Sequence, residues 1–142
     1  MFTTFDDIYK VYKRLVRGIE PYSLPQSVQE QIELIEIGVR LFNRKREGNE
    51  VVFDIVTETV VSQNREKLTD NEILLLAYCM VLQTYNDMLL ELTSMLSMST
   101  KDSSIKDYKG QVAVRRQQVR DQEFLINNLL LTMSEDFDNN GV

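Results

Sequence analysis

The sequence predicts a mainly α-helical single domain: a four-helix bundle-like fold with a possible short β segment at about residues 50–62 and a flexible acidic C-terminal tail. Three observations support this prediction. The chain has 142 residues, which suits one domain with its own core. Only two prolines and five glycines interrupt the 142 residues. Between them, apolar residues recur at spacings of three and four, the period of one helix face.

The first two helices have clear start signals. Thr4 and Asp7 form a capping pair that opens the first helix. A linker at about 19–26 contains both prolines and separates it from the second helix. That second helix opens with a capping box that begins at Ser27, or it opens earlier at Ser23 ahead of Pro25. The basic residues of 44–46 before a glycine are typical of its end.

Residues 50–67 are ambiguous. Most of their apolar side chains are β-branched, which favours a strand. One lone strand cannot satisfy its hydrogen bonds inside a helical domain, so the segment makes a small hairpin or pairs with another chain, with a helix as the remaining alternative. For pairing between subunits, the candidate residues are Val51, Phe53 and Ile55.

The third helix should be the centre of the fold. Thr69 and Glu72 form the clearest capping box in the sequence. From Ile73 to about Leu96 there is no basic residue, and apolar side chains occupy nearly the whole circumference. Such a helix is buried inside its own domain or partly by other subunits.

A polar connector at 97–104 leads to a fourth helix from about Ile105 to Met133. Its apolar side includes either Leu125 or Ile126. Residues 134–142 carry acids and no base and are expected to be a flexible tail. The predicted division is therefore a helical domain at 1–133 and a tail at 134–142.

Composition excludes most familiar catalytic sites. The chain has no histidine and one cysteine, Cys79, which removes Cys/His zinc sites, histidine-dependent nucleophilic catalysis and any intramolecular disulfide. We expect Cys79 to be an inert core thiol. The sequence thus predicts a protein that is not an enzyme and holds no cofactor or metal.

No membrane association is expected. The longest uncharged apolar run, Ile73–Leu82, has ten residues, whereas a spanning helix needs about 20. The first residues are acidic and lack the basic segment of a signal peptide. A lone cysteine suits a reducing compartment, so we expect a cytosolic protein.

The charge distribution contains the main functional signal. The net charge is −6, which disfavours general nucleic-acid binding. Residues 101–120, however, hold six basic and two acidic side chains, whereas 121–142 hold five acids and no base. The basic part of the fourth helix is a solvated face, or it binds an acidic partner or a nucleic-acid backbone. A small helical regulator that captures a protein through 105–120 is one hypothesis.

Three segments together resemble a known family. They are Thr4–Tyr9, the block Leu68–Ile73 continuing to Val81, and Lys106–Lys109 with the basic helix that follows. In this order they are similar to the head–tail connector (adaptor, or head-completion) proteins of tailed bacteriophages. The resemblance extends over most of the chain, although the β-like stretch at 51–61 departs from the family's helical pattern.

The resemblance implies a structural virion protein in the neck, present in the host cytoplasm during assembly. Such subunits form a ring, usually twelvefold, that joins the portal to the stopper or tail-completion proteins. Double-stranded DNA passes through the ring without specific binding. The family's C-terminal segment docks on the portal, and here the corresponding candidates are Lys106, Lys109, Arg115, Arg116, Arg120 and Phe124.

Overall fold

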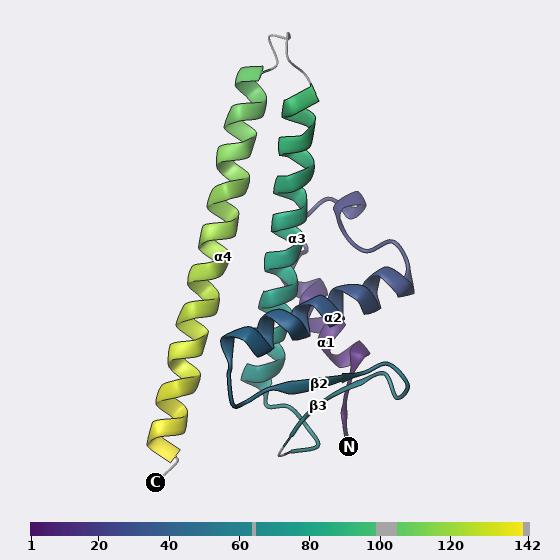
Figure 1. Ribbon diagram of the computed structural model, residues 1–142, viewed down its shortest axis with the longest axis vertical. Helices are drawn as coiled ribbons and strands as arrows, with labels where there is room; N and C mark the ends of the chain where they lie inside the picture. The colour runs from purple at the N-terminus through teal and green to yellow at the C-terminus, as the bar shows by residue number, and fades with distance from the viewer. Residues whose placement is uncertain (64, 99–104, 141–142) are drawn as a thin grey trace.

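The structure is a computed structural model that describes the backbone of residues 1–63, 65–98 and 105–140, and all their side chains except those of 96–98, 105–108 and 135–140. A long helical hairpin stands on a base of two further helices and a small sheet (Figure 1). The predicted mainly α fold is confirmed. The elements are β1 (Thr3–Thr4), α1 (Phe5–Leu15), the 3-10 turn η1 (Pro21–Ser23), α2 (Val28–Lys45), β2 (Val51–Asp54), β3 (Thr59–Ser62), α3 (Asp70–Met98) and α4 (Ile105–Asn140).

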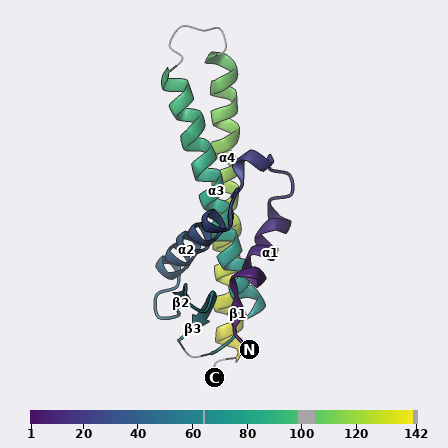
Figure 2. The ribbon, with the colours of Figure 1, turned by 90° about the vertical axis from the view of Figure 1, so that its right-hand side faces the viewer.

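The core surrounds the first half of α3, as the sequence predicts. This helix contacts α1, α2 and α4, and its side chains from Leu75 to Leu82 are buried, apart from the half-buried Tyr78. In the side view, α1 and α2 lie across the lower part of the hairpin (Figure 2). Toward the connector, α3 is less covered by the rest of the chain, and Leu90 is exposed there.

One segment, Asp70–Met95 of α3, is long and apolar enough to cross a membrane by length and composition alone. Half of an 18-residue window within this segment is buried inside the protein. The central helix of a soluble fold has the same properties, so this observation gives little support to a membrane span.

The ambiguous segment forms a hairpin within the chain. β2 and β3 pair antiparallel with Phe53 opposite Val60, and β1 adds to the other edge of β3. The Asp54 carboxylate accepts from the N–H groups of two turn residues, which stabilises the reversal. The apolar side of this β-hairpin faces the helices, and Phe53 stacks on Phe5 with ring centroids 4.9 Å apart.

The structure therefore gives the residues expected to pair between subunits a role within the chain. On the outer edge of the hairpin, the side chain of Asn43 accepts from the N–H of Val51 at 2.8 Å and donates to its C=O at 2.9 Å. Those backbone groups are not free to extend the sheet. Phe53 lies in the hairpin, and Ile55 lies in the exposed turn after β2.

The predicted helix starts are confirmed at Thr4 and Thr69. Thr4 exchanges hydrogen bonds with Asp7, and Thr69 does so with Glu72. At Ser27 only half of the expected box is present, because the Glu30 carboxylate accepts from the N–H of Gln26 at 2.7 Å instead of closing back on the cap residue.

The fourth helix differs from the prediction at its C-terminal end. The sequence placed a flexible tail at 134–142, but α4 continues as helix to Asn140. Neither glycine nor proline occurs after Met133 until Gly141, and extending an existing helix costs far less than starting one. Of the two alternatives for the buried side, Ile126 is buried and Leu125 is exposed. The predicted connector at 97–104 lies mostly outside the described residues.

Glu72 ties three segments together at the start of α3. Its buried carboxylate accepts from the N–H of Thr69 at 3.0 Å and forms ion pairs with Arg65 at 2.8 Å and with Arg46 at 3.2 Å. Arg46 follows α2, and Arg65 belongs to the loop after β3. A buried carboxylate is stable only with such partners, so this cluster fixes the base of the helical hairpin formed by α3 and α4.

A close approach at Gly38 sets the packing of α2 on α3. A Cβ atom at this position would lie 2.7 Å from Cγ of Met80, which is fully buried. Gly38→Ala should lower the free energy of unfolding by about 1 kcal/mol, because the steric penalty exceeds the gain in helix propensity. In the matched control Gly110→Ala, where the added Cβ meets nothing within 4 Å, urea unfolding should show stabilisation of up to about 1 kcal/mol. Equal stabilisation by both variants would contradict this packing.

Removing the charge of Glu72 should be costly. In Glu72→Gln the cap hydrogen bond to Thr69 can persist, but Arg46 loses its buried partner, so we expect a loss of about 2–3 kcal/mol in unfolding free energy. The control is Glu36→Gln, which removes an exposed pair with Arg40 and should cost less than about 0.5 kcal/mol. Similar losses for both variants would show that the Glu72 cluster is not a structural centre.

Candidate functional site

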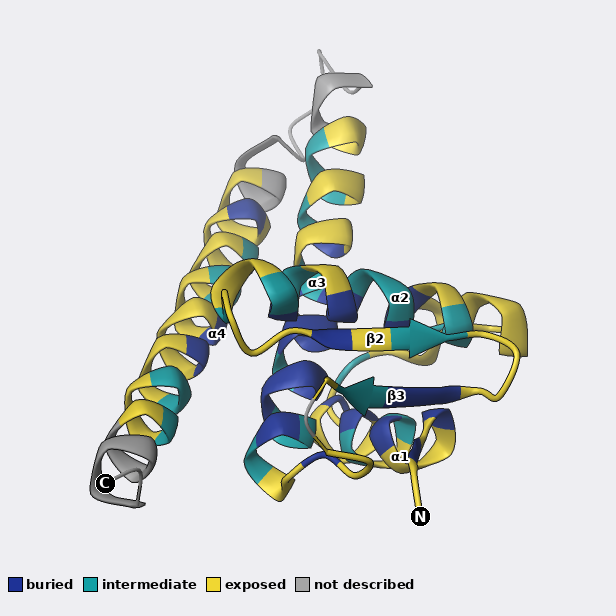
Figure 3. Ribbon diagram, turned by 60° about the horizontal axis from the view of Figure 1, so that its bottom comes forward, coloured by how far each residue is buried: buried dark blue, intermediate teal, exposed yellow. Residues whose placement is uncertain are grey.

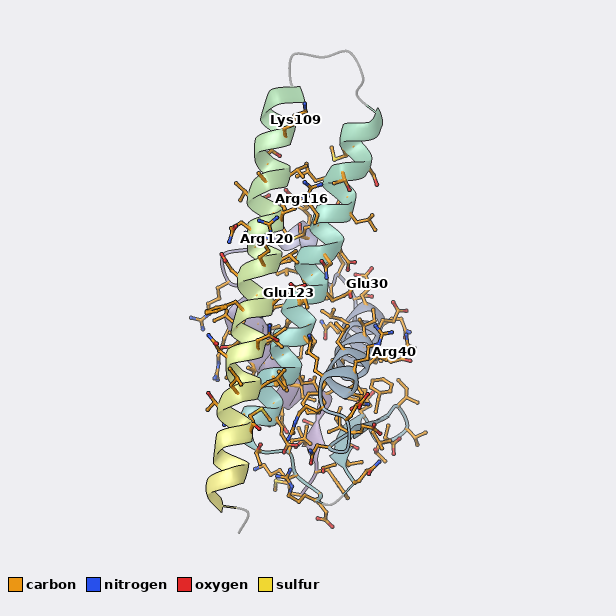
Figure 4. The ribbon with its side chains drawn as sticks, turned by 60° about the vertical axis from the view of Figure 1, so that its left-hand side comes forward. Glu30, Arg40, Lys109, Arg116, Arg120 and Glu123 are labelled. Atoms are coloured by element: carbon orange, nitrogen blue, oxygen red, sulfur yellow. The ribbon has the colours of Figure 1, made fainter. Side chains whose placement is uncertain are left out.

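The basic residues of α4 form a stripe on one side of the helix. Lys109, Arg116 and Arg120 are all exposed, and spacings of seven and four residues place them on one helix face. They follow one another along α4 in Figure 4, with Glu123 after them. None of the three cations forms an ion pair with a side chain that the structure describes. The side chain of Lys106 lies outside the described residues.

Arg115 does not belong to this stripe. It is half-buried, donates to Oε1 of Gln118 at 2.9 Å, and lines a small pocket of about 270 Å³ together with Tyr22 and Glu91. One residue along a helix turns the side chain by about 100°, which places Arg115 toward α3 and η1. The structure thus brings together three of the five predicted cations.

A groove of about 820 Å³ continues the stripe toward the base of the molecule. It lies between the end of α2 and the second half of α4, and Asn127, seven residues after Arg120, forms part of its wall. Arg44 and Lys45 line it from α2, and both are exposed without an ion pair to any described side chain. The apolar part of its wall is Leu130, Leu131 and Met133.

We call this surface the basic flank. It consists of Lys109, Arg116, Arg120, Arg44 and Lys45, with the exposed side chains of Phe124 and Leu131 beside them. Among the described residues, its acidic members are Glu47 and Glu123. Figure 3 shows exposed residues along much of α4. Cations around apolar side chains fit a protein partner with an acidic surface.

Sequence reasoning missed Arg44 and Lys45 as members of this surface. It treated the basic run at 44–46 only as a helix end, and Arg46 does have a structural partner in Glu72. A run of three bases exceeds what a helix end requires, and this was the available signal. Only the fold shows that α4 passes beside it.

The buried hydroxyl of Tyr12 and the buried thiol of Cys79 both lie in the hydrophobic core. The hydroxyl of Tyr12 lies 2.7 Å from that of Thr84, which donates to the C=O of Met80 at 3.0 Å. Burial raises the pKa of Tyr12 to about 12. Burial also raises the pKa of Cys79 to about 12. Within the described part of the chain, no group of three or more Cys, Asp or Glu side chains could hold a metal ion.

Comparison with known proteins decides the origin of the chain. The sequence model of the YomZ prophage protein family matches residues 1–135. The chain belongs to this family. It is therefore a phage-derived protein, as the three sequence motifs suggested, whereas a connector role is a finer assignment that the match does not address. No curated protein and no solved structure is significantly similar to the chain.

The thiol of Cys79 should behave as a core group. At about pH 8, a thiol reagent such as Ellman's reagent should label the native protein only at the rate of its unfolding. Burial excludes the reagent and keeps the thiol protonated, whereas the thiolate is the reactive form. Above pH 9.0, the pKa of an unperturbed thiol, the unfolded chain loses this proton first. The free energy of unfolding should then fall by about 1.4 kcal/mol per pH unit up to about pH 12.

The control variant is Cys79→Ala, whose stability should fall less over the same alkaline range, as measured by urea unfolding. Tyr12, with an unperturbed pKa of 10.0, contributes a similar loss in both proteins above that pH. Labelling of the native thiol as fast as that of a free cysteine would contradict its placement in the core.

Proposed function

We propose that the chain is a structural subunit of the phage particle, an adaptor that forms a ring between the capsid portal and the tail. The supporting observation is the basic flank. α4 packs on α3 through one side only, and its other side presents cations together with Phe124, which is 64% exposed, and Leu131, which is 63% exposed. Large apolar side chains grouped on a surface mark a site of protein contact.

The partners in this proposal are further copies of the chain, the portal, and the stopper or tail-completion proteins. The phage origin of the family agrees with such a role. The net charge of −6 also suits a channel wall, because a cationic lining would hold the phosphates of passing DNA. In this role the protein needs no catalysis, no cofactor and no membrane, and it resides in the virion neck after assembly in the host cytoplasm.

A regulator that binds an acidic protein is the second candidate, favoured by the unpaired stripe of Lys109, Arg116 and Arg120. The charge reversal Arg116→Glu with Arg120→Glu separates the two. A regulator should lose its target and alter the synthesis of phage proteins. An adaptor should leave synthesis unchanged and give defective particles.

The adaptor role predicts a specific assembly defect. After deletion of the gene in a lysogen and induction of the prophage, electron microscopy should show heads and tails that are not joined, at normal amounts of each. A plasmid copy of the wild-type gene should restore joined particles, and the same copy with Lys10→Glu, a charge reversal on the exposed side of α1, should restore them equally. Normal infectious particles without the protein, or purified particles that do not contain it, would refute the adaptor role.

A further inference from the structure

The two ends of α2 have opposite charge. Its first turns carry Glu30 and Glu33, and its last turn carries Arg44 and Lys45. In the middle, Glu36 and Arg40 neutralise each other in an ion pair of 2.7 Å. The helix has 18 residues and is therefore about 27 Å long. It lies across the hairpin, so it carries this difference in charge from one side of the molecule to the other (Figure 1).

The first turns of α2 belong to a second surface, which we call the acidic flank. Here a groove of about 370 Å³ is lined by the carboxylates of Glu30, Glu33 and Asp87, next to the segment around η1. These carboxylates accept hydrogen bonds from the backbone N–H of Gln26 and from two glutamine amides. None of them pairs with a described cation.

The acidic flank also presents apolar side chains. Tyr22 is 73% exposed and Val28 is 67% exposed. Phe124 and Leu131 have the equivalent place on the basic flank. Each flank thus has apolar groups that burial against a partner would stabilise, with charges of one predominant sign around them.

The two flanks lie on opposite sides of the molecule. In Figure 1, α4 and the end of α2 form the left side, whereas η1 and the start of α2 form the right side. Two copies related by a two-fold axis through either flank would bring like charges together, which costs several kcal/mol in a close interface. The acidic flank of one copy against the basic flank of the next brings opposite charges together, and this contact leaves one flank of each copy free for another.

We propose that copies of this chain associate head to tail, with the acidic flank of one copy against the basic flank of the next. Glu30, Glu33 and Asp87 then face Arg44, Lys45 and the stripe on α4, while Tyr22 and Val28 meet the apolar side chains beside that stripe. A repeated head-to-tail contact gives a ring when its rotation closes. This inference rests on the proposed ring subunit and names the surfaces that would join its copies.

Charge reversal on each flank tests the contact. One variant carries Arg44→Glu and Arg116→Glu on the basic flank, and the other carries Glu33→Lys and Asp87→Lys on the acidic flank. Sedimentation velocity should show oligomers of the wild-type chain that weaken as salt rises, because screening shortens the range of the attraction. Each variant alone should associate at least about tenfold more weakly, since like charges then meet at the contact.

Rescue distinguishes a direct contact from general damage. An equal mixture of the two variants should regain association, because one variant has two acidic flanks and the other has two basic flanks, so every contact between them joins opposite charges. A single chain with all four substitutions should also associate. Circular dichroism should show unchanged helix content throughout, and Lys10→Glu, with a charge change of the same size as each basic-flank substitution, should associate like the wild type. Unchanged oligomers in both variants, or no rescue in the mixture, would overturn the inference.

Cross-linking extends the test to assembled particles. With Cys79→Ala as background, a chain with both Lys45→Cys and Glu33→Cys should give a ladder of multimers with a short bis-maleimide, whereas each single-cysteine chain should stay monomeric, because its cysteine faces no second cysteine at the contact. A chain that stays monomeric in solution and gives no ladder in particles would overturn the head-to-tail contact. If that chain is nevertheless present at the neck, the adaptor role still stands. Association through these flanks by a protein that is absent from particles would instead refute the adaptor role alone.

Discussion

The fold depends on covering a helix that is apolar around almost its whole circumference. The first half of α3 can be stable in water only if neighbours surround it, because each exposed leucine or methionine there would cost about 1.5–3 kcal/mol. Its own chain supplies α1, α2 and α4 for this purpose, and the Glu72 cluster fixes its start against the base. The small sheet in turn covers part of α1 and α2, through the stacked pair Phe5 and Phe53 and the Asn43 side chain.

This way of covering α3 creates the outer surfaces. Gly38 lets α2 lie close against α3, so the acidic and the basic end of α2 lie on opposite sides of the α3–α4 hairpin. α4 covers α3 with one side and has little other contact within the chain, so its second side presents cations and large apolar groups. The proposed association uses both consequences, since the polarity of α2 and the uncovered side of α4 form the two flanks.

The elements could be predicted from local patterns, whereas the surfaces could not. Capping boxes at Thr4 and Thr69 placed two helix starts correctly, and the apolar run after Ile73 identified the central helix. The conformation of residues 50–67 stayed ambiguous because the third strand of the sheet is only Thr3–Thr4, which is too short to give a recognisable sequence pattern. The extension of α4 to Asn140 was missed because acidic composition was taken for disorder. The basic flank combines α2 with α4, and no sequence pattern indicates that these two elements adjoin.

The most direct measurement is a cryo-electron microscopy map of the neck of induced particles, at a resolution that traces helices. The account predicts a ring in which the start of α2 and η1 of each copy lie against α4 and the end of α2 of its neighbour. The outer side of every α4 should then be covered. A neck without this chain, or a ring whose copies meet through other surfaces and leave Phe124 and Leu131 in solvent, would contradict it.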